Sequence, residues 1–204
     1  PVIETDLVRV TFSSRGGDVL SYKLKEHKDG NDFVEMIFAG EGGSRAFTLA
    51  LGDAKARPLA DLFHLRRPSD PVVEFYRDYA LPGDGGEARI FRLTKRYEFR
   101  PGEYLFELSV TLDGGYSIPS LNFSGAAYTL EFGPQIGPKF EKLSQRYEYR
   151  HYYTYAAGKR KTEKVSAKAP TVITNRISWA AIAGKYFTFV AVPEIGRASC
   201  RERV

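Results

Sequence analysis

The residues that could bind a metal or perform catalysis are few and far apart in this sequence. Its three histidines are His27, His64 and His151, and no two of them have the i, i+4 spacing of a helical zinc site. The single cysteine, Cys200, cannot form an internal disulfide. We therefore predict no metal centre, and we interpret each histidine as a surface or turn residue.

Nucleophile and phosphate-binding motifs are also missing from the sequence. It contains neither a Gly-x-Ser-x-Gly elbow nor a phosphate loop ending in Gly-Lys-Ser/Thr. The glycine-rich segment 15–18 (Arg-Gly-Gly-Asp) is not followed by a helical pattern, so we predict that it turns a hairpin. Carboxylate pairs such as Asp84 with Glu87 are expected by chance among 25 acidic residues. We therefore predict no catalytic residue, no cofactor and no enzyme activity.

The stretch from Lys139 to Lys164 combines positive charge with tyrosines. It holds eight Lys or Arg against three Glu, a local net charge of +5. Five tyrosines are interleaved with them, at positions 147, 149, 152, 153 and 155. The candidate contact residues of this stretch are Lys139, Lys142, Arg146, Arg150, Tyr152, Tyr153, Lys159, Arg160 and Lys161.

Three interpretations of this stretch remain open. Cations and aromatic rings can bind phosphates and stack on bases, as nucleic-acid surfaces do. They can also hold a protein face close to an anionic membrane surface or to another protein. The third interpretation is a solvated hairpin of two amphipathic strands that turn at Ala157-Gly158. Nucleic acid is the least favoured of these partners, and we predict none.

The elements that must position these residues are β-strands, because the dominant hydrophobic period is two. Tyr104, Phe106, Leu108, Val110 and Leu112 alternate with more polar residues. The segment 91–99 shows a similar apolar face that Lys95 interrupts. Strands are predicted at 7–12, 19–24, 32–38, 46–51, 72–80, 91–99, 104–112, 127–132, 147–155, 160–165, 176–183 and 186–192.

Many short strands separated by Gly- and Pro-containing turns predict an all-β sandwich. Only Pro138–Ser144 and Leu59–Leu65 could hold a short helix. A hydrophobic content of 43% and a charged content of 27% indicate a folded globule. The apolar stretches Trp179–Ala183 and Tyr186–Val192 are far shorter than the roughly 18 residues of a membrane span. We find no linker or repeat, and predict one domain over residues 1–194.

The last ten residues, 195–204, read Ile-Gly-Arg-Ala-Ser-Cys-Arg-Glu-Arg-Val. This string matches an in-frame translation of a common sequencing adapter, so we predict that it is not native. Without its three arginines and one glutamate the formal net charge falls from +5 to +3. On this prediction the natural sequence is interrupted near Pro193 and the domain is incomplete at its C-terminus.

Three patches in a fixed order resemble a known family. They are segment 8–24, which contains Arg15, Gly16 and Gly17, segment 132–155 around Gly-Pro-Gln-Ile-Gly-Pro-Lys-Phe, and segment 175–193. The last carries a Trp-x-Ala-x-x-x-x-Tyr-Phe pattern followed by proline. Together they resemble the periplasmic domain of the YidC/Oxa/Alb family of membrane protein insertases. The residues that fall on the family's patterns are Arg15, Gly16, Gly17, Trp179, Tyr186, Phe187 and Pro193.

The resemblance implies a β-supersandwich similar to mutarotase-like folds. It implies an accessory domain on the periplasmic side of the bacterial inner membrane, within a multi-pass protein that inserts and folds membrane proteins. The implied partners are Sec translocon components, SecDF and SecYEG, and membrane-protein clients. No catalytic residue is carried over, because the family's insertion groove lies in transmembrane helices outside this sequence.

An alternative function follows from the same fold class. A mutarotase-like sandwich can bind or modify carbohydrates, and such enzymes need a histidine and a carboxylate that converge in a cleft to move a proton. His64 or His151 would have to supply the histidine. Neither lies in a motif that indicates this chemistry.

Overall fold

The computed structural model describes residues 1–37, 45–82, 88–114, 126–132, 150–164, 173 and 176–194. The chain divides into two compact units, with the described residues up to 132 in the first and those from 150 onwards in the second. Every regular element in the described ranges is a β-strand. The prediction of an all-β fold is therefore confirmed.

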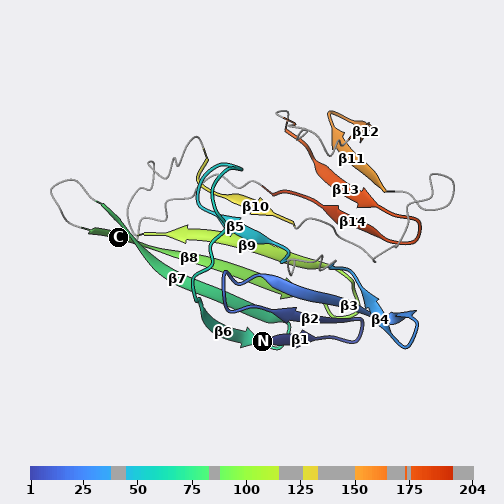
Figure 1. The fold of residues 1–204 in the computed structure, drawn as a ribbon, viewed down its shortest axis with the longest axis horizontal. Coiled ribbons are helices and arrows are strands. Elements are labelled where there is room, and N and C mark those ends of the chain that lie inside the picture. The colour runs from blue at the N-terminus through green and yellow to red at the C-terminus, as the bar shows by residue number, and fades with distance from the viewer. Residues whose placement is uncertain are drawn as a thin grey trace. The chain divides into compact units, whose positions relative to one another are not determined.

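The first unit contains two four-stranded antiparallel sheets and a short strand pair (Figure 1). One sheet has the order β1 (Val2–Glu4), β2 (Val8–Phe12), β3 (Val19–Asp29), β4 (Asp32–Glu35). The other has the order β6 (His64–Ser69), β7 (Val72–Pro82), β8 (Ala88–Phe99), β9 (Phe106–Asp113). β5 (Thr48–Ala50) pairs with β10 (Thr129–Glu131).

Aromatic side chains pack the two four-stranded sheets of this unit against each other. The ring centroid of Phe12, on β2, lies 5.5 Å from that of Phe75 on β7 and 4.9 Å from that of Tyr97 on β8. Phe99 lies 6.2 Å from Phe12 and 5.3 Å from Phe106 on β9. The three pairs of Phe12 are tilted or edge-on and the Phe99–Phe106 pair is stacked, and these are geometries that aromatic rings prefer. The alternating apolar positions predicted from the sequence thus form one face of each sheet.

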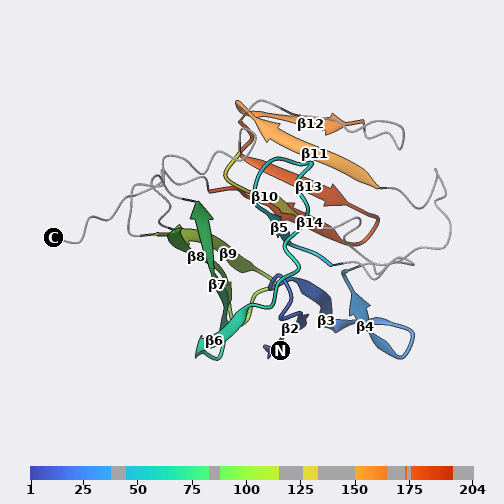
Figure 2. The ribbon, with the colours of Figure 1, turned by 60° about the vertical axis from the view of Figure 1, so that its left-hand side comes forward.

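The second unit is a single antiparallel sheet in the described residues. Figure 2 shows its strands in the order β12 (Lys159–Glu163), β11 (His151–Ala156), β13 (Trp179–Ala183), β14 (Thr188–Ala191). β11 and β12 turn at Ala157 and Gly158, whose φ angles are 49° and 78°. This is the turn predicted from the sequence, and glycine adopts positive φ without steric cost.

The expected short helix at Leu59–Leu65 is wrong. Residues 59–63 are non-helical and His64 begins strand β6. The backbone groups that a helix would pair internally bind other segments instead. The carbonyl of Asp61 accepts a hydrogen bond from Gly16 N at 2.9 Å, and Phe63 N donates to the carbonyl of Ser14 at 2.8 Å. The second candidate helix, Pro138–Ser144, lies outside the described residues.

The segment 15–18 forms a tight turn between β2 and β3, in which Arg15 is exposed and the other three residues are buried. Gly16 and Gly17 have φ angles of 71° and 62°, which only glycine adopts readily. A Cβ on Gly16 would lie 2.6 Å from the carbonyl oxygen of Leu59, and one on Gly17 would lie 2.7 Å from the Cβ of Phe75. The turn therefore packs directly on strand β7 and on the segment before β6, and this close approach requires both glycines.

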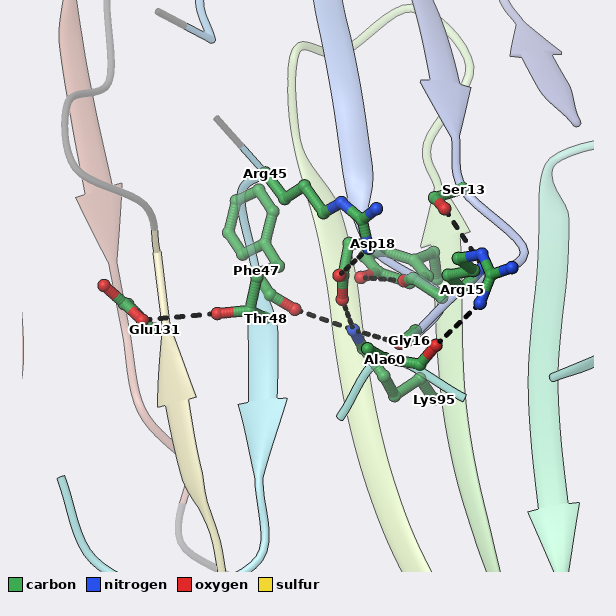
Figure 3. Close-up of polar contacts among 12 residues, drawn as sticks. Ser13, Arg15, Gly16, Asp18, Arg45, Phe47, Thr48, Ala60, Lys95 and Glu131 are labelled. Carbon is green, nitrogen blue, oxygen red and sulfur yellow. Dashed lines mark hydrogen bonds and ion pairs between the residues drawn. The ribbon is translucent and has the colours of Figure 1, made fainter. Parts of the chain in front are cut away.

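The fully buried side chain of Lys95 binds this turn through hydrogen bonds (Figure 3). Lys95, on β8, has a side-chain exposure of 0%. Its Nζ donates hydrogen bonds to the carbonyl of Gly16 at 2.9 Å, to Asp18 Oδ1 at 3.0 Å and to the carbonyl of Phe47 at 2.7 Å. Three acceptors satisfy the three protons of an ammonium group. Lys95 therefore links the β6–β9 sheet to the β2–β3 turn and to the start of β5.

The charges of Lys95 and Asp18 are buried, and this burial explains why the two side chains need all of these contacts. Burial lowers the pKa of Lys95 and raises the pKa of Asp18, while the attraction between the two charges opposes both shifts. Arg45 adds a weaker contact, with its Nη1 3.7 Å from Asp18 Oδ2. A buried ion pair contributes little net stability, but loss of one partner leaves an uncompensated buried charge. The intact cluster is thus a constraint on the fold more than a source of net stability.

The opposite face of the β6–β9 sheet carries a ladder of ion pairs. Glu74, on β7, is bound by Arg66 from β6 and by Arg96 from β8, with Arg96 Nη1 2.9 Å from Glu74 Oε1. Arg92 binds both oxygens of Asp78, at 2.7 Å and 2.8 Å. Burial raises the pKa of Glu74, but the hydrogen bonds from Arg96 and Arg66 outweigh it and the net shift is downward.

We predict that Glu74 makes the stability of the chain depend on pH in the acid range. Because its folded-state pKa lies below the ordinary value of 4.5, Glu74 stabilises the fold above about pH 4.5. This stabilisation is lost as the pH falls through the folded-state pKa. Glu74→Gln should therefore lower the free energy of unfolding by about 1–2 kcal/mol at neutral pH and by much less near pH 3. Urea unfolding at a series of pH values measures both quantities.

The matched control is Glu103→Gln, because Glu103 is half exposed and its carboxylate lies 3.9 Å from Arg100. Exposed ion pairs of this kind contribute little. A Glu74→Gln protein that is as stable as the wild type at neutral pH, or equally destabilised at pH 3, would contradict the prediction.

We also predict that Lys95→Met destabilises the chain strongly. The variant keeps an unbranched apolar stem but leaves Asp18, which is 1% exposed, with only the weaker contact of Arg45 at 3.7 Å. Removal of one partner of a buried pair costs about 3–5 kcal/mol, measured as a shift in urea unfolding. Lys55→Met removes the same charge from an exposed turn and should change the stability by less than about 0.5 kcal/mol. Equal effects of the two substitutions would show that the buried contacts of Lys95 contribute nothing.

Candidate functional site

The predicted basic-aromatic contact residues fall on the second unit where the structure describes them. Lys139, Lys142 and Arg146 lie outside the described residues. Arg150 immediately precedes β11, and the others occupy β11 and β12: Tyr152, Tyr153, Lys159, Arg160 and Lys161. The sequence treats them as one surface, but the strand register assigns them to two faces.

Cross-strand pairs identify the members of each face, because residues directly opposite each other point to the same side. Tyr155 is opposite Arg160 and Trp179, and Tyr153 is opposite Ala181. We call this side the aromatic face, with His151, Tyr153, Tyr155, Arg160 and Trp179 as its members. Tyr152, Thr154, Lys159, Lys161 and Glu163 lie on the opposite side of the sheet.

Rings and one guanidinium group organise the aromatic face. Tyr155 and Trp179 stack with their ring centroids 5.4 Å apart and an interplanar angle of 5°. The guanidinium carbon of Arg160 lies 4.9 Å from the ring centroid of Tyr153, a cation–π contact. The Tyr153 hydroxyl and His151 Nδ1 are 2.8 Å apart. Tyr153, Tyr155 and Trp179 are half-buried, as is Tyr152 on the other side of the sheet.

Glu163 is the single acidic residue of the β11–β12 hairpin, and it lies on the side of the sheet opposite the aromatic face. Glu163 accepts a hydrogen bond of 2.6 Å from Thr154 Oγ1 and one of 2.9 Å from Lys161 Nζ. These bonds, that from Thr154 first, lower the pKa of Glu163. Lys159 and Arg160 are exposed, as is Lys161. Burial lowers the pKa of Arg150, which sets it apart from the solvated cations of β12.

The hairpin β13–β14 carries the remaining residues of the second unit that the sequence singled out. Trp179 begins β13, and the turn is closed by a hydrogen bond of 2.9 Å from Gly184 N to the carbonyl of Phe187. Tyr186 projects from this turn with 77% of its surface exposed. Pro193 lies exposed just after β14.

The other residues of the sequence pattern, Arg15, Gly16 and Gly17, belong to the buried turn of the first unit. The guanidinium group of Arg15 reaches the carbonyl of Ala60 at 3.4 Å. The pattern residues are thus spread over both units, and they do not form one site within either.

Sequence reasoning missed Asp18 and Glu74, and it noted Lys95 only as an interruption of an apolar face. A charged residue at an apolar position of a strand was the available signal for Lys95.

Among the hollows that the described residues of the first unit line, one of about 80 Å³ is formed by Arg66, Glu74, Tyr76, Arg92 and Thr94 on the ion-paired face of the β6–β9 sheet. His64 stacks on Tyr76 beside it, with ring centroids 5.3 Å apart. A smaller one, of about 30 Å³, lies near the β5–β10 pair and includes Thr48, Asp53 and Glu131.

The larger hollow brings a histidine close to carboxylates, as the carbohydrate-modifying alternative requires. However, arginines bind both of the nearby carboxylates, Glu74 and Asp78, and the pKa of each is lowered. A carboxylate with a lowered pKa is a weak general base and is not protonated at neutral pH. This geometry does not favour the alternative.

Within the described ranges, no three His, Cys, Asp or Glu side chains come together as a set that could hold a metal ion. The same residues include no helix with the length and apolar character of a membrane span. What the second unit does offer is a surface of cations and aromatic rings. Such a surface suits contact with a partner.

Comparison with known proteins assigns the family. A family model described as the YidC periplasmic domain matches residues 2–202. The membrane protein insertase YidC of Treponema denticola is 40% identical over 200 residues, which cover 95% of this chain and 34% of that protein. The corresponding protein of Treponema pallidum is 33% identical, over 94% of this chain and 36% of its own length. That of Geotalea daltonii is 29% identical, over 91% and 35%.

The chain spans about a third of the length of these relatives. The match to residue 202 includes part of segment 195–204, whose adapter origin stays a prediction, as does the single-domain boundary at 194. The family's periplasmic domain is a β-supersandwich, the fold class predicted from the sequence, and the family is not one of enzymes. On a match over nearly its whole length, the chain belongs to the family of YidC periplasmic domains.

Proposed function

We propose that this chain is the accessory periplasmic domain of a membrane protein insertase and acts there as a binding and scaffold module. The observation that carries the proposal is the family match over residues 2–202, together with relatives named as membrane protein insertases. In this proposal the domain supports the insertion and folding of membrane proteins, with or beside the Sec translocon. It lies on the periplasmic side of the bacterial inner membrane, as part of a multi-pass protein.

The proposed partners are Sec translocon components, SecDF and SecYEG, and membrane-protein clients. Features of the described surface support a contact role. Lys159, Arg160 and Lys161 are exposed on one edge strand, and exposed apolar side chains such as Ile90 and Leu62 are 60% and 57% accessible on the first unit.

The complete gene gives the first test. The proposal predicts at least one apolar stretch of about 20 residues before this domain and several after it. A gene that ends soon after Pro193, with no such stretch on either side, would contradict the proposal.

Photo-crosslinking gives the second test and maps the contact. A photoreactive amino acid is placed in the full-length protein at Leu62, Ile90 or Tyr186, three exposed positions on different parts of the described surface. We expect at least one position to cross-link to a Sec component in membranes, and the same position to lose the product when that component is depleted. Lys55 serves as the control, since it is exposed in a turn of the first unit. Cross-linking at none of the three positions, in membranes that contain the translocon, would refute a Sec-contacting role.

A further inference from the structure

The hollow on the ion-paired face of the β6–β9 sheet has more cations than anions in its lining. The lining residues are Arg66, Glu74, Tyr76, Arg92 and Thr94. The one carboxylate among them belongs to Glu74, whose side chain is 7% exposed and is bound by two arginines, Arg66 and Arg96. Two guanidinium groups therefore line the hollow beside one carboxylate that is already neutralised.

The other carboxylates on this face of the sheet are bound as well. Asp78 accepts hydrogen bonds of 2.7 Å and 2.8 Å from Nε and Nη2 of Arg92. Glu98 accepts one of 2.7 Å from Arg96. Asp113 is opposite Arg92 on β9, and neither Asp113 nor Glu98 lines the hollow. These acidic residues lower the affinity of the face for an anion, so we expect binding in the millimolar range.

Hydrogen-bond donors remain on the side chains that line the hollow. Arg66 and Arg92 each bind a carboxylate through Nε and Nη2. Within the described ranges, the Nη1 group of neither arginine has a hydrogen-bond partner, and the Thr94 hydroxyl has none either. A guanidinium group can only donate hydrogen bonds. The unused capacity of the lining is therefore rich in donors, and it suits a ligand that is rich in acceptors.

The strand register places these donors around one position of the sheet. Tyr76 on β7 is opposite Thr94 on β8. Arg66 pairs with the residue two before Tyr76, and Arg92 pairs with the residue two after it. All four side chains lie on one face, because strand residues two apart point to the same side. The guanidinium carbon of Arg92 also lies 4.8 Å from the Tyr76 ring centroid, which brings this group over the middle of the site.

The size of the hollow and the directions of its donors indicate the ligand class. A space of about 80 Å³ accepts one group of a few heavy atoms. Donors from different strands can surround a tetrahedral oxyanion, whereas a planar carboxylate is matched by the fork of a single arginine. The hollow near the β5–β10 pair offers the opposite chemistry, since Asp53 and Glu131 line it and no Lys or Arg does.

We propose that the hollow on the β6–β9 sheet binds a tetrahedral oxyanion, a phosphate or sulfate group, through Nη1 of Arg66, Nη1 of Arg92 and the hydroxyl of Thr94, with Tyr76 as a wall. The oxyanion is either a free ion or part of a larger molecule that extends into solvent. This ligand site belongs to the first unit and does not depend on the proposed role in membrane protein insertion.

Titration of the 204-residue chain, followed by NMR of the arginine Nε–H signals, tests the proposal. The ligands are sodium phosphate, sodium sulfate and sodium acetate, at a constant ionic strength set with sodium chloride. We expect saturable shifts of the Arg66 and Arg92 signals with phosphate and sulfate, and an affinity for acetate that is at least about fivefold weaker. Shifts that do not saturate by about 50 mM phosphate, or equal affinity for acetate, overturn the proposal.

Glycerol 3-phosphate distinguishes the two sources of the oxyanion. If it binds at least as tightly as inorganic phosphate, the site accepts a phosphate ester with its remainder in solvent. If only inorganic phosphate and sulfate bind, the site is one for the free ion. Shifts of other arginines in place of Arg66 and Arg92 would mean that the oxyanion binds elsewhere and would overturn the assignment to this hollow.

Two matched pairs of variants locate the site. Arg92→Lys keeps the positive charge but removes the second donor nitrogen, and it should weaken phosphate binding by at least about tenfold. Arg9→Lys is the control, because Arg9 is 50% exposed in an ion pair with Glu4, as Arg92 is 53% exposed in its pair with Asp78. This control should change the affinity by less than about twofold.

Thr94→Val removes the hydroxyl at nearly constant volume, and we expect it to weaken phosphate binding by about threefold. Thr111→Val makes the same change at the position opposite Thr94, which does not line the hollow, and should leave the affinity unchanged. Urea unfolding confirms that each variant is folded before it is titrated. Equal effects within both pairs would show that these side chains do not contact the oxyanion, and the proposal would be wrong.

Discussion

A fully buried ammonium group imposes the strictest condition on this structure. Lys95 sits among aromatic side chains, where an unpaired charge would cost far more than the fold can supply. Its three protons must therefore meet acceptors, and these come from the Gly16 carbonyl, Asp18 and the Phe47 carbonyl. The neighbouring Tyr97 repeats the arrangement, because its hydroxyl donates to the carbonyl of Gly17 at 2.9 Å. In the observed arrangement the glycine turn, the β6–β9 sheet and the start of β5 satisfy all of these groups.

The two units differ in how their charged side chains are used. In the first unit many charges pair with each other, in the buried cluster around Lys95 and in the ladder around Glu74. In the second unit the cations of β12 have a single carboxylate among them, and Glu163 is already bound on its own hairpin. Paired charges specify a fold, whereas an excess of one sign is available to a partner of the opposite sign. The proposed role as a contact module follows from this division.

The sequence predicted those features that depend on local pattern. Period-two alternation located most strands, and Ala157-Gly158 was recognised as a turn because positive φ favours glycine. Strand β6 was missed, since His64–Ser69 is exposed throughout, mostly polar, and shows no alternation. Lys95 was visible as an interruption, but its partner Asp18 is 77 residues away in sequence and only the tertiary fold joins them. The basic-aromatic stretch was recognised as a set, and its division into two faces required the register between β11, β12 and β13.

Lys95 and Asp18 act as one unit that specifies the fold. A double-mutant cycle of Lys95→Met and Asp18→Asn, measured by urea unfolding, tests whether the two side chains are coupled. We expect the double variant to be more stable than the sum of the single losses implies, with a coupling energy of about 1–3 kcal/mol. Additive losses, within about 0.5 kcal/mol, would mean that the two side chains stabilise the fold independently and that they do not act as a unit.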